Sequence, residues 1–497
     1  MTIATPAGLS FRSASGRWVV VATALGSGMA MLDGSVVNVA LRQIGEHLDA
    51  SLAQLQWITN GYLLALASLI LVGGSLGDRY GRRRVFLIGV GWFALASALC
   101  AAAQDPSQLI AARVLQGIGG ALLTPGSLAM IQSAFRTEDR GRAIGAWAGF
   151  GGIATAVGPF VGGWLVEYAS WRWVFLINLP LAAVTVLITL RHAPESRDTE
   201  SAQHFDVAGA GLATLSLVGV TFALIEATTL PVAAVATSAA VGLLAGLAFV
   251  PVEQRRLHPM MPTHLFASRQ FSAANGMTLL VYAALGALMF FLVLQLQTVS
   301  GYGPLRAGMA TVPVTVMMLL FASRGGELAT RIGPRLPMTL GPFACAAGAA
   351  LLVGVGEHVS YWTEVLPGLL AFSVGLCLLV APLTSTVLAA APDRNAGIAS
   401  GINNAVARAG SLLAVAALPA AVGLRGDDYA RPVVFAAGYA RALWVCVVLL
   451  ALGGVVSWLL VRDPERDVGV AATPADPVSC RTTPMGDAEH QQRDRAN

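Results

Sequence analysis

The chain of 497 residues is 56% hydrophobic and only 12% charged, whereas soluble globular proteins are roughly 25% charged. This composition excludes a large soluble enzyme and an intrinsically disordered chain, and it leaves a polytopic helical membrane protein. All 31 basic residues are Arg, and without Lys the chain has no Walker A nucleotide site, so we expect an ion gradient and not ATP to supply energy. The small net charge of +4 does not indicate nucleic-acid binding.

Apolar runs long enough to cross a membrane, about 20 residues each, follow one another along the chain. The first run is too long for the core of a cleaved signal peptide and has no small-residue cleavage site after it, so we expect it to remain as a span. We expect about fourteen spans, at residues 18–41, 54–76, 85–104, 107–134, 141–166, 173–191, 206–227, 231–251, 271–298, 305–323, 337–356, 362–390, 396–423 and 440–461.

The Arg residues are distributed unevenly between the two sides that these spans define. If the N-terminus is cytoplasmic, about 23 Arg fall on the inner side and about 6 on the outer side, and cytoplasmic loops are the ones that carry such an excess. The absence of Lys and the abundance of Ala, Gly and Arg are typical of a GC-rich bacterial genome. We therefore expect a multi-pass protein of the bacterial inner membrane with both termini in the cytoplasm.

The chain also repeats itself at a spacing of about 253 residues. GSLGDRYGRRR at 74–84 has a partial copy, GELATRIGPR, at 326–335, and Asp139-Arg140 corresponds to Asp393-Arg394. Two parallel six-helix halves fit this repeat. That plan resembles the major facilitator superfamily, which implies an all-α membrane fold of two six-helix bundles, here with two extra central helices.

The repeat and the polar stretches together predict the division of the chain. The expected parts are a cytoplasmic N-terminus at 1–17, an N-terminal six-helix bundle at 18–191, a cytoplasmic linker with two extra spans at 192–270, a C-terminal six-helix bundle at 271–461, and a cytoplasmic tail at 462–497.

The first span contains MLDGSVVNVAL at 31–41, in which an acid and an Asn precede Val-Ala-Leu. This segment resembles the first-span signature of the fourteen-span drug:proton antiporter family within that superfamily. Arg42 stands where the signature usually has Pro, a departure that leaves Asp33 and Asn38 unaffected. We expect Asn38 in the substrate cavity.

The loop after the second span, GSLGDRYGRRR at 74–84, is similar to the superfamily's signature between spans 2 and 3. Gly74 would let helices approach closely, Asp78 would cap or pair at a helix end, and the Arg residues would anchor at the inner surface. The alternative is a basic loop that only sets topology. In the partial copy Thr330 replaces the acid, so we expect any charge latch in the first half. The residues with an expected conformational role are Gly74, Asp78, Arg79, Gly81, Arg82 and Arg83.

RVLQGIGGA at 113–121 resembles the superfamily's fourth-span motif and places Arg113, Gln116, Gly117 and Gly120 on one helical face. An Arg inside a span is costly and normally faces a partner or a cavity. We place Gln116 among the expected cavity residues.

Asp33 in the first span is the candidate partner of Arg113. At 1.5 Å per residue Asp33 lies about 22 Å above the inner end of its span, and Arg113 lies about 21 Å up in a core of about 30 Å. We expect Asp33 to bind the transported proton and Arg113 to set its proton affinity, since burial and a neighbouring cation act on it in opposite directions. The alternative is a static structural ion pair.

The fifth span reads GAWAGFGGIATAVGPFVGGWL at 145–165, and its Gly158, Pro159, Gly162 and Gly163 resemble the motif associated with antiporters. Pro159 can bend the span, and the paired glycines let another helix pack closely. Ala154 stands where that motif has Gly.

WRWVFLINLP at 171–180 resembles the junction of the fifth and sixth spans in the fourteen-span family. We interpret Trp171 and Trp173 as anchors at the membrane interface, with substrate binding as the alternative.

The second half carries less charge at membrane depth, because Gly286 and Leu366 stand at the repeat positions of Asp33 and Arg113. Proton coupling is therefore expected in the first half. Arg408 has no evident acidic partner in the sequence. Residues of the second half that we expect to line the cavity, with packing as the alternative for each, are Tyr282, Phe290, Phe291, Gln295, Asn403 and Asn404.

The resemblance implies a transporter, not an enzyme, that exports hydrophobic small molecules such as antibiotics in exchange for protons by alternating access. The expected partners are that substrate, protons and the bilayer, with no cofactor, metal or nucleic acid, and we expect a monomer. The main alternative is a major facilitator transporter of one endogenous metabolite or lipid. A membrane enzyme or sensor is a weaker alternative, because the longest polar segments are too short for a soluble domain.

Overall fold

The chain folds into helices, and fourteen of them are long and apolar enough to cross a membrane in the computed structural model of the protein. This confirms the predicted number of spans. The structure describes residues 8–197, 206–256, 259–392 and 395–463. The predicted tail beyond residue 463, the repeat positions Asp393 and Arg394, and Cys480 lie outside these ranges.

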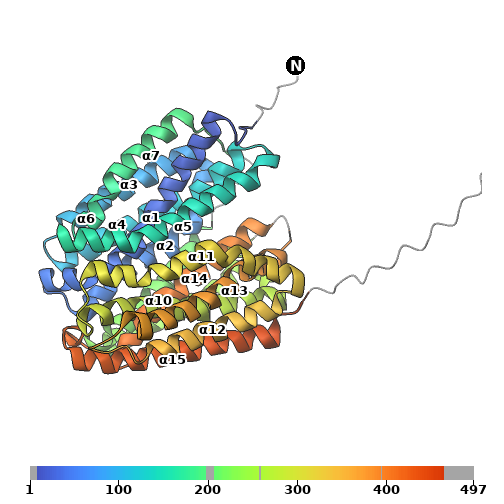
Figure 1. The fold of residues 1–497 in the computed structure, drawn as a ribbon. Coiled ribbons are helices and arrows are strands. Elements are labelled where there is room, and N and C mark those ends of the chain that lie inside the picture. Colours follow the sequence, from blue (N-terminus) through green and yellow to red (C-terminus); the bar gives the residue numbers. More distant parts are fainter. Residues whose placement is uncertain (1–7, 198–205, 257–258, 393–394, 464–497) are drawn as a thin grey trace, which may run out of the picture. The chain divides into compact units, whose positions relative to one another are not determined.

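The first six spans are built from seven helices. α1 packs against α5 and α7, and α4 packs against α2 and α3 (Figure 1). The sixth span consists of α6 and α7 with one residue, Ile177, between them, and together they cover Trp173–His192, close to the predicted run at 173–191. The helices are α1 (Ala14–Leu48), α2 (Leu52–Tyr80), α3 (Arg82–Ala102), α4 (Pro106–Ala134), α5 (Thr137–Tyr168), α6 (Trp173–Leu176) and α7 (Asn178–His192).

The last six spans repeat this packing. α10 packs against α14 and α15 as α1 packs against α5 and α7, and α13 packs against α11 and α12 as α4 packs against α2 and α3. The elements are α10 (Arg269–Thr298), α11 (Pro304–Ile332), α12 (Arg335–Leu352), η4 (Tyr361–Val365), α13 (Leu366–Ala389), α14 (Ala396–Ala421), η6 (Asp428–Ala430) and α15 (Pro432–Leu460). The internal repeat seen in the sequence is thus a repeat of helix packing.

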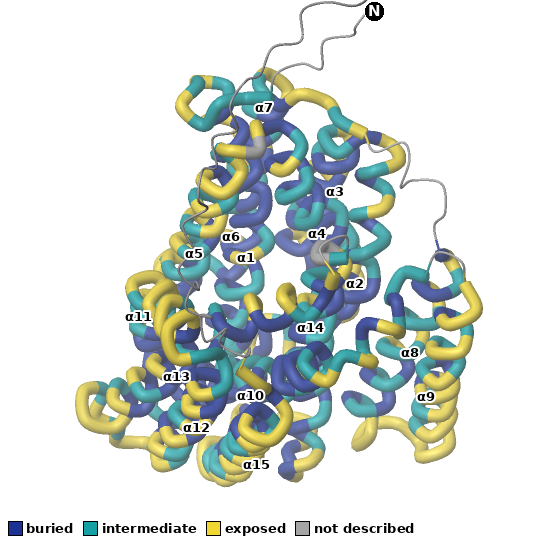
Figure 2. The backbone as a smooth tube through the Cα atoms, turned by 90° about the vertical axis from the view of Figure 1, so that its right-hand side faces the viewer, coloured by how far each residue is buried: buried dark blue, intermediate teal, exposed yellow. Residues whose placement is uncertain are grey.

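The two extra spans form a hairpin of α8 (Val207–Ile225) and α9 (Val232–Arg255), joined by η2 (Glu226–Thr228) and followed by η3 (Thr263–Ala267). α8 packs against α2 of the first half and α14 of the second (Figure 2). α9 is largely exposed and contacts mainly α8. The hairpin therefore lies beside both halves, at their edge and not between them.

Two glycines end equivalent helices of the two halves. Gly81 follows α2 with φ +111°, and Gly333 follows α11 with φ +92°. This backbone region disfavours L side chains, so Gly permits the tight turn that starts the next span. At Gly81 a Cβ would also lie 2.7 Å from the carboxylate of Glu195.

Trp171 and Trp173 have different environments, contrary to the prediction that both are interface anchors. Trp173 is exposed, as an anchor would be, but Trp171 is 2% exposed. Its Nε1 donates to Nδ1 of His47 at 3.3 Å, and its ring packs edge-on against Phe175. Trp171 is a packing residue because the chain turns back into the bundle before α6.

Candidate functional site

Asp33 and Arg113 meet in the interior of the first half. Asp33 of α1 is 0% exposed, and Arg113 of α4 is 1% exposed. Nη1 of Arg113 donates to Oδ2 of Asp33 and forms an ion pair with it. The structure thus places together the two residues that the depth argument paired.

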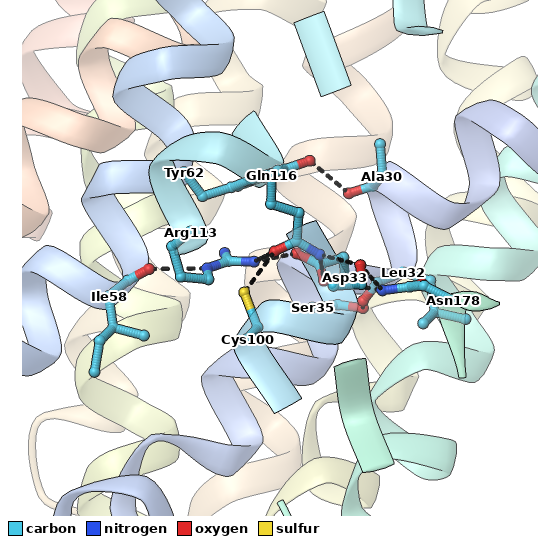
Figure 3. Close-up of polar contacts among 11 residues, drawn as sticks. Ala30, Leu32, Asp33, Ser35, Ile58, Tyr62, Cys100, Arg113, Gln116 and Asn178 are labelled. Atoms are coloured by element: carbon cyan, nitrogen blue, oxygen red, sulfur yellow. Dashed lines mark hydrogen bonds and ion pairs between the residues drawn. The ribbon is translucent and has the colours of Figure 1, made fainter. Parts of the chain in front are cut away.

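Two side-chain amides, of Gln116 and Asn178, donate hydrogen bonds to the carboxylate (Figure 3). Oδ1 of Asp33 accepts hydrogen bonds from Nε2 of Gln116 at 2.8 Å and from Nδ2 of Asn178 at 3.3 Å. Both amides also donate to Oγ of Ser97, at 2.8 and 3.3 Å. The carboxylate of α1 is therefore bonded directly by side chains of α4 and α7, and Ser97 of α3 holds both amides.

Arg113 connects this buried cluster to the space between the halves. Its Nε donates to the backbone oxygen of Ile58 at 3.0 Å, and its guanidinium lies 4.4 Å from the centre of the Tyr62 ring. Arg113 and Tyr62 line a cavity of about 180 Å³, and Asp33 lies behind them. Access to the carboxylate from this cavity passes Arg113.

That cavity adjoins a larger one of about 330 Å³, and the two share Leu63, Tyr282 and Ser411 in their walls. We call both together the central cavity. Its walls come from α1, α2 and α4 of the first half and α10, α13 and α14 of the second. Of the residues predicted for a substrate cavity, five line it, namely Asn38, Tyr282, Phe290, Asn403 and Asn404.

The other three predicted cavity residues lie away from these walls. Gln116 is buried in the Asp33 cluster. Phe291 is buried and stacks on Phe435 of α15. Gln295 is buried and donates to the backbone oxygen of Val355 at 2.8 Å. Each points into the packing of its own half, because the cavity faces only one side of each helix.

The charged residues in the described walls of the central cavity are Arg113 and Arg408. No carboxylate occurs among these wall residues. Within the described part of the chain no cluster of His, Cys, Asp and Glu is suited to a metal ion.

Hydrogen bonds join the two halves at the end that carries the α1–α2 and α14–α15 loops, which we call the joined end. Nε2 of Gln56 donates to the backbone oxygens of Val415 at 2.7 Å and Ala416 at 2.9 Å. The hydroxyl of Tyr429 donates to the backbone oxygen of Ala50 at 2.8 Å. Further hydrogen bonds join Gln297 to Val39, Leu52 to Gly426 and Leu305 to Glu167.

Tyr429 lies in η6, outside the spans, and is buried. Burial raises the pKa of Tyr429 to about 12, so its hydroxyl keeps its proton and remains a donor throughout the physiological range. This contact of the joined end is therefore insensitive to pH in the physiological range.

The loop between α2 and α3 contains an ion pair, as expected, but its close helix contact lies one residue from the predicted position. Nη2 of Arg82 lies 2.8 Å from Oδ1 of Asp78. A Cβ on Gly73 would lie 2.0 Å from the backbone oxygen of Ala121 in α4, whereas one on Gly74 would have an ordinary 3.7 Å contact. Gly73, which the prediction omitted, is the residue near this loop at which α2 lies against the backbone of α4.

Two other residues of the 74–84 motif have defined neighbours. Arg83 donates to the backbone oxygen of Leu190 at 2.8 Å, and Arg79 lies over the ring of Tyr80. Thr330 in the partial copy donates to the backbone oxygen of Glu327 at 2.7 Å. The ion pair of the first-half loop is therefore replaced there by a local hydrogen bond.

The glycines of the fifth span serve two interfaces of α5. A Cβ on Gly158 would lie 2.1 Å from Oγ of Ser35, and one on Gly162 would lie 2.6 Å from Val36, both in α1. A Cβ on Gly163 would lie 2.5 Å from Cα of Leu305 in α11. The motif thus holds α5 against the helix that carries Asp33 and against the opposite half.

Pro159 belongs to the second of these interfaces. A Cβ on Gly308 of α11 would lie 2.2 Å from the backbone oxygen of Pro159. The α5–α11 contact is therefore made by backbone on both sides, at the joined end.

Ser97 and Asn178 are the members of the Asp33 cluster that the sequence did not predict. Asn178 lies in the WRWVFLINLP segment, of which the sequence analysis interpreted only the tryptophans. Asn178 could have been predicted as a partner of Asp33, because it is a polar amide inside a span at a similar depth. Ser97 gave no signal, since Ser commonly satisfies its hydroxyl on its own helix backbone.

Comparison with known proteins gives one family. The model of the Major Facilitator Superfamily matches residues 23–415 of the chain. The tetracenomycin C resistance and export protein of Streptomyces glaucescens is 34% identical over 435 residues, which cover 85% of this chain and 80% of that protein. The puromycin resistance protein pur8 of Streptomyces alboniger is 33% identical over 480 residues, covering 93% and 95%.

Two further comparisons agree. The multidrug resistance protein Stp of Mycobacterium tuberculosis is 35% identical over 405 residues, covering 80% of this chain and 74% of that protein. Among solved structures, the POT family transporter PepTSo is similar in fold, with a TM-score of 0.66 at 14% identity over 89% of this chain and 97% of that one.

Proposed function

The chain belongs to the major facilitator superfamily, and on that premise we propose that it exports hydrophobic small molecules, antibiotics among them, in exchange for protons. Relatives that are 33–35% identical over most of the chain are named for resistance to, or export of, antibiotics and drugs. The chain is accordingly a drug-efflux transporter of the membrane, and the coupling to protons is the part that we infer from the site.

The observation that carries the coupling is the buried Asp33–Arg113 pair beside the central cavity. A carboxylate can accept a proton at membrane depth, and a buried carboxylate with one cationic partner changes the local charge from neutral to positive when it does so. Protonation would then free the guanidinium of Arg113, which faces the cavity. Proton binding at Asp33 is thereby linked to the walls that a substrate contacts.

We further propose that the described conformation opens toward the cytoplasm. The excess of Arg predicts that the joined end faces outward and that both termini lie in the cytoplasm. The hydrogen bonds of Gln56 and Tyr429 close the outer end. A substrate would enter the central cavity from the inner side, and the cycle would require these bonds to break.

Efflux from energised cells tests the proposal. Cells that express the chain are loaded with a lipophilic fluorescent dye, and a growth panel with tetracenomycin C and puromycin is run in parallel. We expect efflux that a protonophore stops and that the Asp33→Asn variant lacks at equal membrane abundance. Asp105→Asn is the matched control, because Asp105 caps α4 outside the cluster and Asn caps helices equally well.

Three results would contradict parts of the proposal. Efflux that persists with the protonophore would exclude the proton gradient as the energy source, and efflux that persists in Asp33→Asn would exclude Asp33 as the proton site. No transport and no resistance for every compound, with normal membrane insertion, would favour a transporter of one endogenous metabolite or lipid.

A further inference from the structure

Arg408 is a second arginine in the central cavity, and it belongs to the other half of the molecule. It lies in α14 and lines the larger part of the cavity together with Tyr282, Asn404 and Ser411. Its Nε is buried and has no hydrogen-bond partner among the described residues. A buried guanidinium nitrogen without a partner inside a membrane protein is costly, and beside a cavity it indicates a place where a ligand can bind.

The charge of Arg408 is not balanced within the described cavity. Arg113 is neutralised by Asp33, whereas the ion pairs of the described residues do not include Arg408. The described walls contain no Asp or Glu. The central cavity therefore has a net positive charge, which attracts anions and repels cations.

The surroundings of Arg408 suit one anionic group attached to an apolar body. Leu63, Val387 and Leu388 supply apolar wall, and a cavity of about 330 Å³ is within the size range of sites for small organic molecules. A planar guanidinium binds a carboxylate through two parallel hydrogen bonds, and this geometry gives both affinity and orientation.

We propose that Arg408 binds substrates in which a single carboxylate is attached to a hydrophobic group about as large as an aromatic ring system. This inference rests on the proposed export function and names its substrate class. The carboxylate would lie on Arg408 of the second half, and the apolar body would extend toward Leu63 and Tyr62 of the first half. Substrate recognition and proton binding would thus occupy different halves.

The test compares a carboxylate with its neutral counterpart on the purified full-length protein in lipid nanodiscs. The probes are 1-pyrenebutyrate and its primary amide, which share the fluorescent body and differ in charge. Binding is measured by fluorescence anisotropy. The variants are Arg408→Gln, Arg408→Lys, and Arg441→Gln as a control that removes an equal charge at an exposed site of α15.

We expect the wild type to bind the carboxylate more tightly than the amide. Arg408→Gln should weaken carboxylate binding about tenfold or more, the effect of losing a charge-assisted hydrogen bond, and leave amide binding within about twofold. Arg408→Lys should retain part of the preference, and Arg441→Gln all of it. A thermal unfolding transition like that of the wild type shows that Arg408→Gln is folded.

Equal binding of the two probes to the wild type, no binding of either, or an unchanged carboxylate affinity in Arg408→Gln would each overturn this proposal. The export function is judged separately by dye efflux. Efflux without a preference for the carboxylate would support the export function and exclude the proposed role of Arg408. An Arg408-dependent preference without any efflux would support that role and contradict the export function.

Discussion

At the scale of single residues, Asp33 and Arg113 neutralise each other's charge, and replacing either one alone is expected to destabilise the protein. Both are buried, and the loss of one partner would leave the other as an uncompensated charge. Breaking a buried pair in this way costs about 3–5 kcal/mol. A loss of transport in a single variant therefore combines an effect on folding with an effect on coupling, and a double variant is needed to separate them.

We predict that Asp33→Asn combined with Arg113→Gln restores stability but not proton-driven efflux. Two neutral amides can hydrogen-bond to each other and to Gln116, so no buried charge remains. Thermal unfolding of the purified double variant should lie closer to wild type than that of Arg113→Gln alone, with efflux still absent. Normal proton-dependent efflux by the double variant would show that the Asp33–Arg113 pair has a structural role and no role in proton coupling.

The sequence could predict the pair but not its full environment. Asp33 and Arg113 are charged residues inside spans, and their depths along two helices can be calculated, so their pairing could be inferred. Ser97 and Asn178 depend on how α3 and α7 are rotated about their axes, which uncharged spans do not reveal. For the same reason Phe291 and Gln295 were expected in the cavity, although they face the packed side of α10.

At the scale of elements, the turn between α2 and α3 depends on one backbone conformation. Gly81 has φ +111° and abuts Glu195, whereas Gly77, four residues earlier, has its nearest neighbour atom 4.0 Å from a Cβ position. We predict that Gly81→Ala destabilises the protein by about 1–3 kcal/mol. Gly77→Ala, the same change in an open position, should be neutral or slightly stabilising. Thermal unfolding in detergent measures both, and equal melting temperatures would refute the argument.

The contact between α5 and α11 gives a second prediction for elements. Gly163 is in backbone contact with Leu305, so a larger side chain would push the halves apart at the joined end. We predict that Gly163→Val inserts into the membrane but loses most of its efflux. Gly91→Val is the control, because Gly91 of α3 is exposed and a Cβ there meets nothing within 4 Å. Wild-type efflux by Gly163→Val would show that this close approach is dispensable.

Helix positions were predicted well and helix contacts less well. Span number and approximate bounds follow from hydrophobicity alone, and TM-length helices occur at each predicted run. In contrast, neighbouring small residues such as Gly73 and Gly74 are equivalent in composition, and only the packing against α4 distinguishes them. The short break between α6 and α7 has a signal that the prediction did not use, because Pro180 has no N–H to donate to the backbone oxygen of Leu176, where α6 ends.

At the scale of the whole molecule, the closure of the joined end, which we propose to be the outer end, depends on a few hydrogen bonds between the halves. Each contributes about 0.5–1.5 kcal/mol, so the loss of one shifts a two-state equilibrium about two- to tenfold. We predict that Gln56→Ala and Tyr429→Phe increase the outward-open population. The Tyr429→Phe effect should be constant between about pH 6 and 9, because the pKa of Tyr429 is about 12.

Labelling of a cysteine in the cavity measures this shift. The described native cysteines are buried, so an Asn38→Cys site in a Cys480→Ser background can be followed with an impermeant maleimide applied to intact cells. Labelling should be faster in Gln56→Ala and Tyr429→Phe. Tyr168→Phe, an exposed tyrosine of α5, is the matched control. Slower or unchanged labelling would contradict the assignment of the joined end as the outer gate.

The architecture of two halves was predictable from the internal repeat, but the conformation was not. The repeat fixes which helices correspond, and their packing follows it. Which end of the cavity is closed depends on a balance of a few hydrogen bonds at η6 and the ends of α1, α2 and α14, which the sequence does not rank. The position of α8 and α9 beside the halves depends on how α8 packs against α2 and α14. The internal repeat does not include these two helices, so it could not predict where they lie.

The most direct test of proton exchange through Asp33 is proton movement that accompanies substrate movement. Purified protein is reconstituted into liposomes that contain a pH-sensitive dye, and an exported compound from the efflux panel is added on one side. For the wild type we predict substrate-dependent proton flux in the opposite direction, and for Asp33→Asn we predict none, while Asp105→Asn behaves as wild type. Substrate transport by the wild type without proton flux, or undiminished proton flux in Asp33→Asn, would contradict the central claim.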